Sequence, residues 1–454
     1  MAPLRPLIFS GFLCHRRMHG KSRHRRVARD EYKSPFSPLR FSRTRFSPRS
    51  RRERSMPVDI IRAEEPQTPI FAADPFSPEA IVDALATNQA IRQAGDLIWL
   101  EKYAMWATGR YAVAHRILGD SESFSSAKRP FSHPDFPLPA ILVTDDPPDH
   151  GPIRSVMGRI LSPKLLRANE AAYRSAAAVA IDRVLVDGDF DAVDDLAVPF
   201  VLSAFGDTVG LRDDGRENLI TFGAAILNTF GPVNDLFLSL VARAEAATRW
   251  VQAQCSRDAL KPDGLGAAIY EAQGRGEISE EQAGLLLMSL LSAGVDTTAG
   301  SIVNMLHCFA RHPEQYARLR ADPTLRTKAF EEVLRYYSPA RVFGRVAHRD
   351  IEMFGRVIRQ GDGILVFLGS AGRDPSIWAD AERFDIGRAS GKHISFGTGI
   401  HNCIGQMLTR TEALALLEML VEKVERIEAV GEPEVLMSNT ITSFEKLPLR
   451  FVAA

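Results

Sequence analysis

The feature that most constrains the fold is a stretch of about 30 residues that is apolar on most of its faces. It begins with Ser279-Glu280-Glu281-Gln282, a capping-box pattern in which a serine and a glutamine three residues later close a helix start. Apolar residues then continue from Leu285 to about Ala310, before His312-Pro313. At 1.5 Å per residue this helix is roughly 45 Å long. Its length and apolar surface predict that it crosses the middle of one large domain.

Shorter elements surround this helix. A second helix is expected from about Leu325 to Tyr337, and short β-prone segments separated by glycines lie between residues 342 and 368. A last long helix is expected from near Cys403 to about Ile427, and residues 435–452 alternate like a small hairpin. The prediction is a mainly α fold with minor β: a helical domain with a long central helix and a small β-sheet region over residues 56–454.

Residues 1–55 differ from the rest in charge. They hold sixteen Lys and Arg against three acidic residues, a net of +13, so the zero net charge of the chain leaves −13 for the remainder. This segment is rich in Arg, Ser and Pro and cannot bury a core, so we expect a basic, disordered extension. A transit peptide and a nucleic-acid-binding tail are alternatives, but an upstream start codon, with Met56 as the true first residue, is favoured.

Four cysteines, Cys14, Cys255, Cys308 and Cys403, are too few for a disulfide scaffold. Cys403 stands out because it lies in Phe396-Gly397-Thr398-Gly399-Ile400-His401-Asn402-Cys403-Ile404-Gly405. A match to this spacing of Phe, Gly, His, Cys and Gly arises by chance on the order of once in ten thousand. The glycines allow a sharp loop that approaches a flat ligand closely. A thiolate before a helix could be a nucleophile or a metal ligand, whereas a buried free cysteine is the plain alternative.

Two further motifs are weaker when taken alone. Glu332 and Arg335 are three residues apart and share a helix face, which is common for a surface ion pair. Asp296-Thr297 follows Gly294 in the middle of the long apolar helix, where an acid and a hydroxyl are costly unless they are used. Because Thr can bend a helix by bonding its own backbone, a small polar pocket is expected there.

Together and in this order, these motifs resemble the cytochrome P450 family. The resemblance covers essentially all of residues 56–454 and includes Asp145-Asp146-Pro147-Pro148-Asp149-His150 with Arg154, and Arg345 with Ala347 and Asp350. It also includes Arg373-Asp374-Pro375 and Phe384-Asp385-Ile386-Gly387-Arg388. The resemblance implies the cytochrome P450 fold, haem b as cofactor, O2 as co-substrate and a monooxygenase reaction, as in the soluble bacterial class.

The resemblance also implies roles for individual residues. Cys403 would be the axial thiolate of the haem iron, in a loop with Phe396, Gly399 and Gly405. Asp296 and Thr297 would be the catalytic acid–alcohol pair that delivers protons. The haem propionates would pair with His150, Arg154, Arg345 and His401, while Glu332, Arg335 and Arg388 would form a buried structural ion triad behind the haem.

Electrons must come from outside, since the chain has no G-x-G-x-x-G motif after a strand and no reductase domain. The resemblance implies a [2Fe-2S] ferredoxin and a ferredoxin reductase fed by NAD(P)H, with Arg159, Lys164 and Arg167 as a weak candidate docking face. The sequence contains no run of 18 apolar residues, so it does not predict a transmembrane helix. We therefore expect a cytoplasmic protein with no membrane and no nucleic-acid partner.

The substrate side resembles the P450 subfamily that oxidises para-substituted benzoates such as 4-methoxybenzoate. One departure is Met288, which stands where that subfamily carries a second Arg, so a differently anchored acid or a neutral phenol stays open. A P450 for a terpenoid or fatty acid, a peroxide-driven enzyme and a haem-thiolate sensor are the alternatives, although the Asp296-Thr297 pair argues against the last two. The matching residues are Arg129, Ser132, Ile226, Leu227, Phe230, Ser289, Ser292 and Phe343.

Overall fold

A computed structural model describes residues 68–133 and 141–454. The predicted basic extension, residues 1–55, lies outside the described residues, so its nature stays a prediction. The α-helices are α1 Pro78–Val82, α2 Ala84–Ala94, α3 Tyr111–Gly119, α4 His150–Ile160, α5 Pro163–Asp187, α6 Val198–Val209, α7 Asn218–Asn228, α8 Asp235–Arg243, α9 Glu245–Gln254, α10 Leu265–Gly274, α11 Glu280–Ala293, α12 Asp296–Arg311, α13 Pro313–Ala321, α14 Arg326–Tyr336, α15 Leu368–Ala371 and α16 Gln406–Lys423.

The long central helix is present but is interrupted. Its capping box is formed as predicted, with the Ser279 side chain accepting from the Gln282 N–H and the Gln282 side chain accepting from the Ser279 N–H. The single helix expected over 285–310 is instead α11 followed by α12, with Gly294 and Val295 between them. At this break Thr297 Oγ1 donates to the Ala293 carbonyl, the bond that was expected to bend the helix. Gly294 also leaves room for α6, since a Cβ at residue 294 would lie 2.2 Å from the ring of Phe205. The aromatic side chain therefore packs directly on bare backbone at the break.

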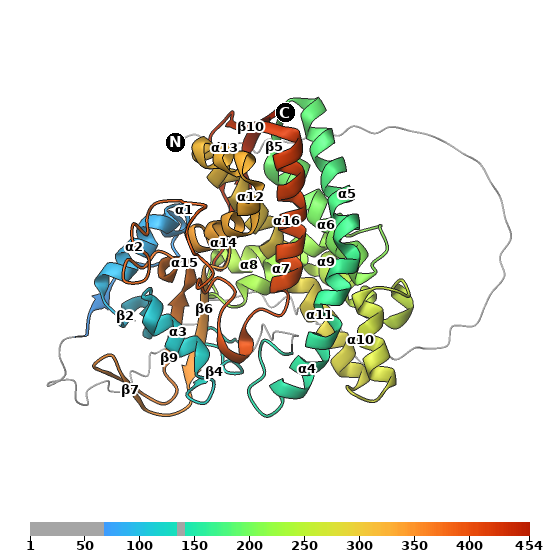
Figure 1. The fold of residues 1–454 in the computed structure, drawn as a ribbon. Helices are drawn as coiled ribbons and strands as arrows, with labels where there is room; N and C mark the ends of the chain where they lie inside the picture. The colour runs from blue at the N-terminus through green and yellow to red at the C-terminus, as the bar shows by residue number, and fades with distance from the viewer. Residues whose placement is uncertain (1–67, 134–140) are drawn as a thin grey trace, which may run out of the picture. The chain divides into compact units, whose positions relative to one another are not determined.

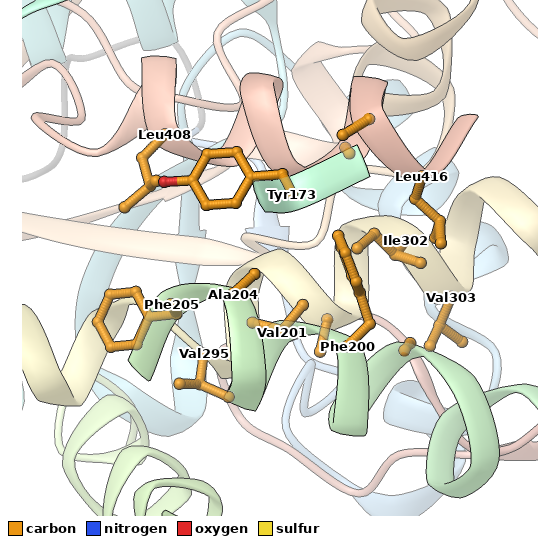
Figure 2. Close-up of a cluster of buried hydrophobic side chains, with 14 of the residues drawn as sticks. Tyr173, Phe200, Val201, Ala204, Phe205, Val295, Ile302, Val303, Leu408 and Leu416 are labelled. Atoms are coloured by element: carbon orange, nitrogen blue, oxygen red, sulfur yellow. The ribbon is translucent and has the colours of Figure 1, made fainter. Parts of the chain in front are cut away.

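The main core lies where the central helices meet α5, α6 and α16. Figure 2 shows Tyr173 of α5, Phe200 and Phe205 of α6, Ile302 of α12 and Leu416 of α16 converging on one apolar cluster. In Figure 1, α5 and α16 run side by side along one flank of this core. Burial of these large side chains supplies the main driving force for folding, at roughly 25 cal/mol per Å² of apolar surface removed from water.

Over the ranges that the structure describes, the strands form a main sheet and three smaller ones. The main sheet has the order β1-β2-β3-β9-β6-β4, in which β6 pairs antiparallel with β9 so that Arg345 lies opposite Ile364. The pairs β7–β8 and β11–β12 are small antiparallel ribbons, as the sequence pattern suggests. The strands are β1 Ile70–Phe71, β2 Ile98–Leu100, β3 Met105–Thr108, β4 Phe124–Ser125, β5 Asp189–Asp191, β6 Val342–Ala347, β7 Ile351–Met353, β8 Arg356–Ile358, β9 Gly363–Phe367, β10 Val424–Ala429, β11 Glu434–Val435, β12 Phe444–Lys446 and β13 Pro448–Ala453.

Two predicted boundaries at the C-terminal end are wrong. The last long helix begins at Gln406 rather than near Cys403, and it ends at Lys423 rather than near Ile427. Residues Val424–Ala429 are a strand because they pair antiparallel with β13, which itself pairs with β5. The predicted C-terminal hairpin therefore accounts only for β11 and β12, while β13 belongs to a separate three-stranded sheet.

One helical segment among the described residues, Glu280–Arg311, is long and apolar enough to span a membrane by length and composition alone. It comprises α11, the break and α12, and 72% of its most apolar window is buried inside the protein. This burial is what a core helix requires, and it is weak evidence for a membrane span.

Candidate active site

The loop before α16 folds back so that Cys403 follows a tight turn. Gly397 and Gly399 have φ of 69° and 72°, the left-handed region that disfavours side chains. A Cβ at residue 399 would also lie 2.8 Å from the carbonyl oxygen of Leu118 at the end of α3. The Cys403 N–H donates to the Phe396 carbonyl at 2.8 Å, which closes the loop. Glycine at residue 399 is thus required by both backbone conformation and space.

Opposing effects act on the sulfur of Cys403. Burial raises the pKa of its thiol above the ordinary value, whereas the backbone N–H groups of Gly405 and Gln406 and the guanidinium groups of Arg154 and Arg410 lower it. These amides belong to the start of α16, where unpaired backbone N–H groups and the helix dipole favour a negative charge, although the helix begins three residues later than expected. Burial has the largest effect, so the net pKa of the thiol is raised. A metal cation bound to the sulfur would hold it as a thiolate.

Buried cationic and polar nitrogens gather on one side of this loop. The rings of His150 on α4 and His401 are 4.5 Å apart between centroids, and the Nε2 atoms of both are buried without a hydrogen-bond partner among the described residues. Arg345 on β6 is buried and donates only to the neighbouring Gly344 carbonyl, at 2.9 Å, among the bonds of the described residues. Arg154 Nη2 donates to the Asn402 carbonyl at 2.6 Å.

This cluster is electrostatically incomplete. Burial, together with the nearby Arg345 and His150, lowers the pKa of His401 to about 3. Burial also lowers the pKa of Arg345 to about 10. The Asp146 carboxylate acts on both groups from a distance, but its own bonds go to Ser125, Ser126 and His348. Buried cationic groups without a hydrogen-bonded anion are costly, and they accept one readily. Next to a cysteine loop, a flat ligand carrying carboxylates, as haem carries its propionates, fits these residues.

The structure brings Glu332, Arg335 and Arg388 together. Arg335 Nε and Nη2 donate to the two carboxylate oxygens of Glu332 at 2.7 and 2.8 Å, and Arg388 Nε donates to one of them at 3.1 Å. Glu332 and Arg335 are fully buried, so this is not the common surface pair that the spacing alone suggested. Arg335 Nη1 also donates to the carbonyls of Gly372 and Ala381, which fastens α14 to the segment before the cysteine loop.

Sequence reasoning missed a second ionic link to the loop. Glu331 accepts from Arg410 Nε on α16 at 2.6 Å and lies 2.9 Å from His393 Nε2. Burial opposes ionisation, but the hydrogen bonds from His393 and Arg410 lower the pKa of Glu331 to about 2. The Arg410 guanidinium lies 4.4 Å from the centroid of the Phe396 ring, so it holds the aromatic side chain beside the loop. The only sequence signal was a second glutamate next to Glu332.

The acid–alcohol pair lies at the start of α12. Thr297 Oγ1 donates to the Ala293 carbonyl at 2.8 Å, the backbone bond that the sequence predicted. Ala293 is exposed although α11 is otherwise a core helix, so open space faces this turn. Burial raises the pKa of Asp296 to about 8, and α7 packs against its carboxyl group at Gly223. The carboxyl is therefore protonated at neutral pH and can donate a proton.

Three of the predicted substrate residues come together from distant segments. Arg129 is half-buried, and its Nη1 donates to the Thr229 carbonyl at 3.1 Å. Its guanidinium lies 5.7 Å from the centroid of the Phe230 ring, and the rings of Phe230 and Phe343 meet edge to face at 5.6 Å. Burial lowers the pKa of Arg129. On α7, Ile226 is half-buried and packs on the main core, and Leu227 is buried.

The predicted hydroxyl anchors are arranged differently. Ser289 Oγ donates to the Leu285 carbonyl at 2.8 Å and also contacts the backbone of Ile141, while Ser292 Oγ donates to the Ser289 carbonyl at 2.9 Å. Both hydroxyl hydrogens are thus taken up by the backbone. Ser132 is exposed, and Met288 is buried at 3% exposure. Among the predicted substrate residues that the structure describes, Arg129 is the one that carries a positive charge.

Comparisons with known proteins agree with this geometry. A family model described as Cytochrome P450 matches residues 252–440, which include α11, α12, the buried ion triad and the cysteine loop. Cytochrome p450 CYP199A2 of Rhodopseudomonas palustris is 39% identical over 393 residues, which cover 85% of this chain and 95% of that protein.

Two solved structures are similar in fold. P450BioI, in complex with an acyl carrier protein ligated to hexadec-9Z-enoic acid, has a TM-score of 0.76 at 25% identity and covers 82% of this chain and 100% of its own. Cytochrome P450 CREJ, in complex with (4-ethylphenyl) dihydrogen phosphate, has a TM-score of 0.76 at 25% identity and covers 84% of this chain and 99% of its own. On this likeness, which spans nearly the whole described chain, the protein belongs to the cytochrome P450 family of monooxygenases.

Proposed function

We propose that this P450 monooxygenase hydroxylates or O-demethylates an aromatic carboxylic acid of the para-substituted benzoate type. The observation that carries the proposal is the arrangement of Arg129, Phe230 and Phe343. A half-buried guanidinium beside two edge-to-face rings suits a flat ring that ends in an anion. The CREJ complex with (4-ethylphenyl) dihydrogen phosphate adds support, because that ligand is also a para-substituted aromatic anion.

The proposed roles follow the contacts. Haem b, held by Cys403 and by the nitrogens of His150, Arg154, Arg345 and His401, would supply oxygen activation with electrons from outside the chain. Phe230 and Phe343 would orient the ring, so that its para substituent faces the reacting centre. Asp296, protonated at neutral pH, would pass protons toward Thr297. Glu332, Arg335 and Arg388 would position the cysteine loop rather than take part in the chemistry.

The electron supply belongs to the same proposal. We assign it to a [2Fe-2S] ferredoxin and a ferredoxin reductase that draws on NAD(P)H, with the whole system in the cytoplasm. Of the basic residues suggested for docking, Arg159 is exposed but already pairs with Glu277. NADH consumption in a reconstituted ferredoxin chain, with a benzoate present, separates this system from a peroxide-driven enzyme and from a sensor without turnover.

Arg129 is the one cation in the predicted substrate group among the described residues, and this limits the type of acid. Met288 adds no charge, and the hydroxyls of Ser289 and Ser292 already donate to backbone carbonyls. Such a site suits a monoanion that is held mainly by Arg129. The test is addition of 4-methoxybenzoate at millimolar concentration to the ferric protein, with the Soret band as readout. We expect a shift towards the high-spin position, and an unshifted band would leave a neutral phenol, a terpenoid or a fatty acid as the substrate class.

Arg129→Ala is expected to weaken binding of 4-methoxybenzoate by roughly ten- to a hundredfold, since a charge-assisted hydrogen bond is worth about 1.5–3 kcal/mol. Binding of the neutral analogue 4-methoxytoluene should change less than about threefold. Titration of the Soret shift measures both ligands. Lys128→Ala, an exposed cation next in sequence, is the control and should leave both affinities as they are. Equal losses for the acid and the neutral ligand would argue against the anchor.

A further inference from the structure

The turn between α7 and α8, residues 229–233, supports the proposed anchor in two ways. It carries Phe230, whose ring meets both Phe343 and the Arg129 guanidinium. It also provides the Thr229 carbonyl, which accepts from Arg129 Nη1 at 3.1 Å. The position of this turn therefore determines where both the cation and one aromatic wall lie.

One residue of a distant loop holds both ends of this turn. Asn439, between β11 and β12, accepts from Asn234 Nδ2 at 3.0 Å and donates back to Asn234 Oδ1 at 3.1 Å. Its backbone N–H donates to Asn228 Oδ1, at the end of α7, at 2.7 Å. Its Nδ2 also approaches the Pro232 carbonyl at 3.5 Å. A single side chain and its own amide thus connect the start and the end of the turn.

The contact is buried and closely fitted. Asn439 is 0% exposed and Asn228 is 2% exposed. A Cβ at residue 231 would lie 2.5 Å from the Cβ of Asn439, so the turn rests on this residue and requires glycine there. Buried amides that lose their partners are costly, because water does not replace them. Shifting the turn would break several of these bonds at once.

We propose that Asn439 is a positioning residue for substrate recognition, which fixes the turn 229–233 and through it the places of Arg129 and Phe230. Asn439 does not itself touch the ligand in this scheme. The proposal rests on the proposed function only for the identity of the anchored acid, because the fastening of the turn follows from the hydrogen bonds alone. Loss of Asn439 should loosen the turn and reduce discrimination between acid and neutral ligands.

A matched control exists in the same region. Asn304 on α12 is also 0% exposed, and its Nδ2 donates to the carbonyls of Tyr337 and Thr442 at 3.1 and 2.9 Å. It therefore fastens the C-terminal loop, as Asn439 does, but makes none of the bonds to the turn. Asn304→Ala should cost stability of the same order as Asn439→Ala without changing the turn.

The experiment compares full-length holoprotein of wild type, Asn439→Ala and Asn304→Ala. Hydrogen–deuterium exchange of a peptide containing residues 229–233 should be at least about tenfold faster in Asn439→Ala, since at least 1.4 kcal/mol of local stability is lost. It should be unchanged in Asn304→Ala. The ratio of dissociation constants for 4-methoxytoluene and 4-methoxybenzoate should fall about tenfold in Asn439→Ala only. If Asn439→Ala does not hold haem, Asn439→Asp replaces it. Aspartate can still accept from Asn234 Nδ2, but it loses the bonds donated to Asn234 Oδ1 and to the Pro232 carbonyl.

The outcomes separate the two proposals. Unchanged exchange of the turn in the Asn439 variants, or equal acceleration in Asn304→Ala, overturns the positioning role. Faster exchange in the Asn439 variants alone, with a reduced acid preference, supports it. If wild type binds no aromatic acid, the proposed substrate class fails, while the exchange comparison still decides whether Asn439 fixes the turn.

Discussion

Glu332→Ala is expected to prevent stable folding around haem. The Glu332 carboxylate is fully buried and accepts from Arg335, from Arg388 and from the backbone N–H of Asp385. Its removal leaves the Arg335 guanidinium buried without a counter-charge. Breaking a buried pair in this way costs about 3–5 kcal/mol, a large part of the roughly 5–15 kcal/mol that stabilises a folded domain. Haem content after purification and the thermal unfolding midpoint measure the loss.

Glu382→Ala is the matched control for this variant. Glu382 also bridges two arginines, Arg92 at 2.7 Å and Arg373 at 2.6 Å, but its own side chain is 55% exposed. The Arg92 and Arg373 side chains are 6% exposed, but the Glu382 carboxylate itself lies largely in water, so water can enter the space that it leaves. A smaller shift of the midpoint is therefore expected. A Glu332→Ala protein with wild-type haem content and midpoint would contradict the role of the buried ion triad.

Asp296→Asn is expected to lower substrate turnover by roughly a hundredfold, within the range that general acid catalysis contributes. The amide matches the carboxylic acid in size, so folding and haem binding should be preserved. It cannot donate an acidic proton, so electrons from NADH should be diverted from substrate oxidation. Product formed per NADH consumed measures this effect. Product yield equal to that of wild type would exclude Asp296 as the proton donor.

The pH profile provides an independent check on Asp296. Burial raises its pKa from 3.8 to about 8, so the carboxyl is protonated at pH 7 and loses its proton as pH rises through about 8. Turnover of wild type should therefore decline above about pH 8, whereas Asp296→Asn should lack this step. The folded protein holds this proton more tightly than the unfolded chain does, so this group makes folding less favourable as pH rises from about 4 to about 8. The same alkaline step in both proteins would assign it to another group.

Local patterns were enough to predict part of the fold. The capping box at Ser279 and the backbone bond of Thr297 involve residues three or four apart, so their partners are visible in the sequence. A distortion near Gly294 was expected from the backbone bond of Thr297, but the packing of Phe205 on Gly294 was not, because Phe205 comes from another helix. The sequence of Val424–Ala429 predicts a helix, because the segment forms a strand only through its pairing with β13.

The candidate site likewise contains residues that had a local sequence signal and residues that had none. The spacing of the cysteine loop and the pair of Glu332 and Arg335 were visible locally, whereas Arg388 was assigned through the family resemblance. The link from Glu331 to Arg410 and His393 spans 79 and 62 residues and had no local signal. Asn439 was missed for the same reason, since its partners are more than 200 residues away. The burial that raises the pKa of Asp296 likewise appears only after folding.

The most direct measurement is the difference spectrum of the reduced protein with carbon monoxide, recorded for wild type, Cys403→Ser and Cys255→Ser. A haem iron bound by a cysteine thiolate gives a band at about 450 nm, so wild type and the Cys255 variant should show it. The Cys403 variant should lose it. A Cys403→Ser protein that retained the band would contradict Cys403 as the axial ligand, and with it the arrangement of the site.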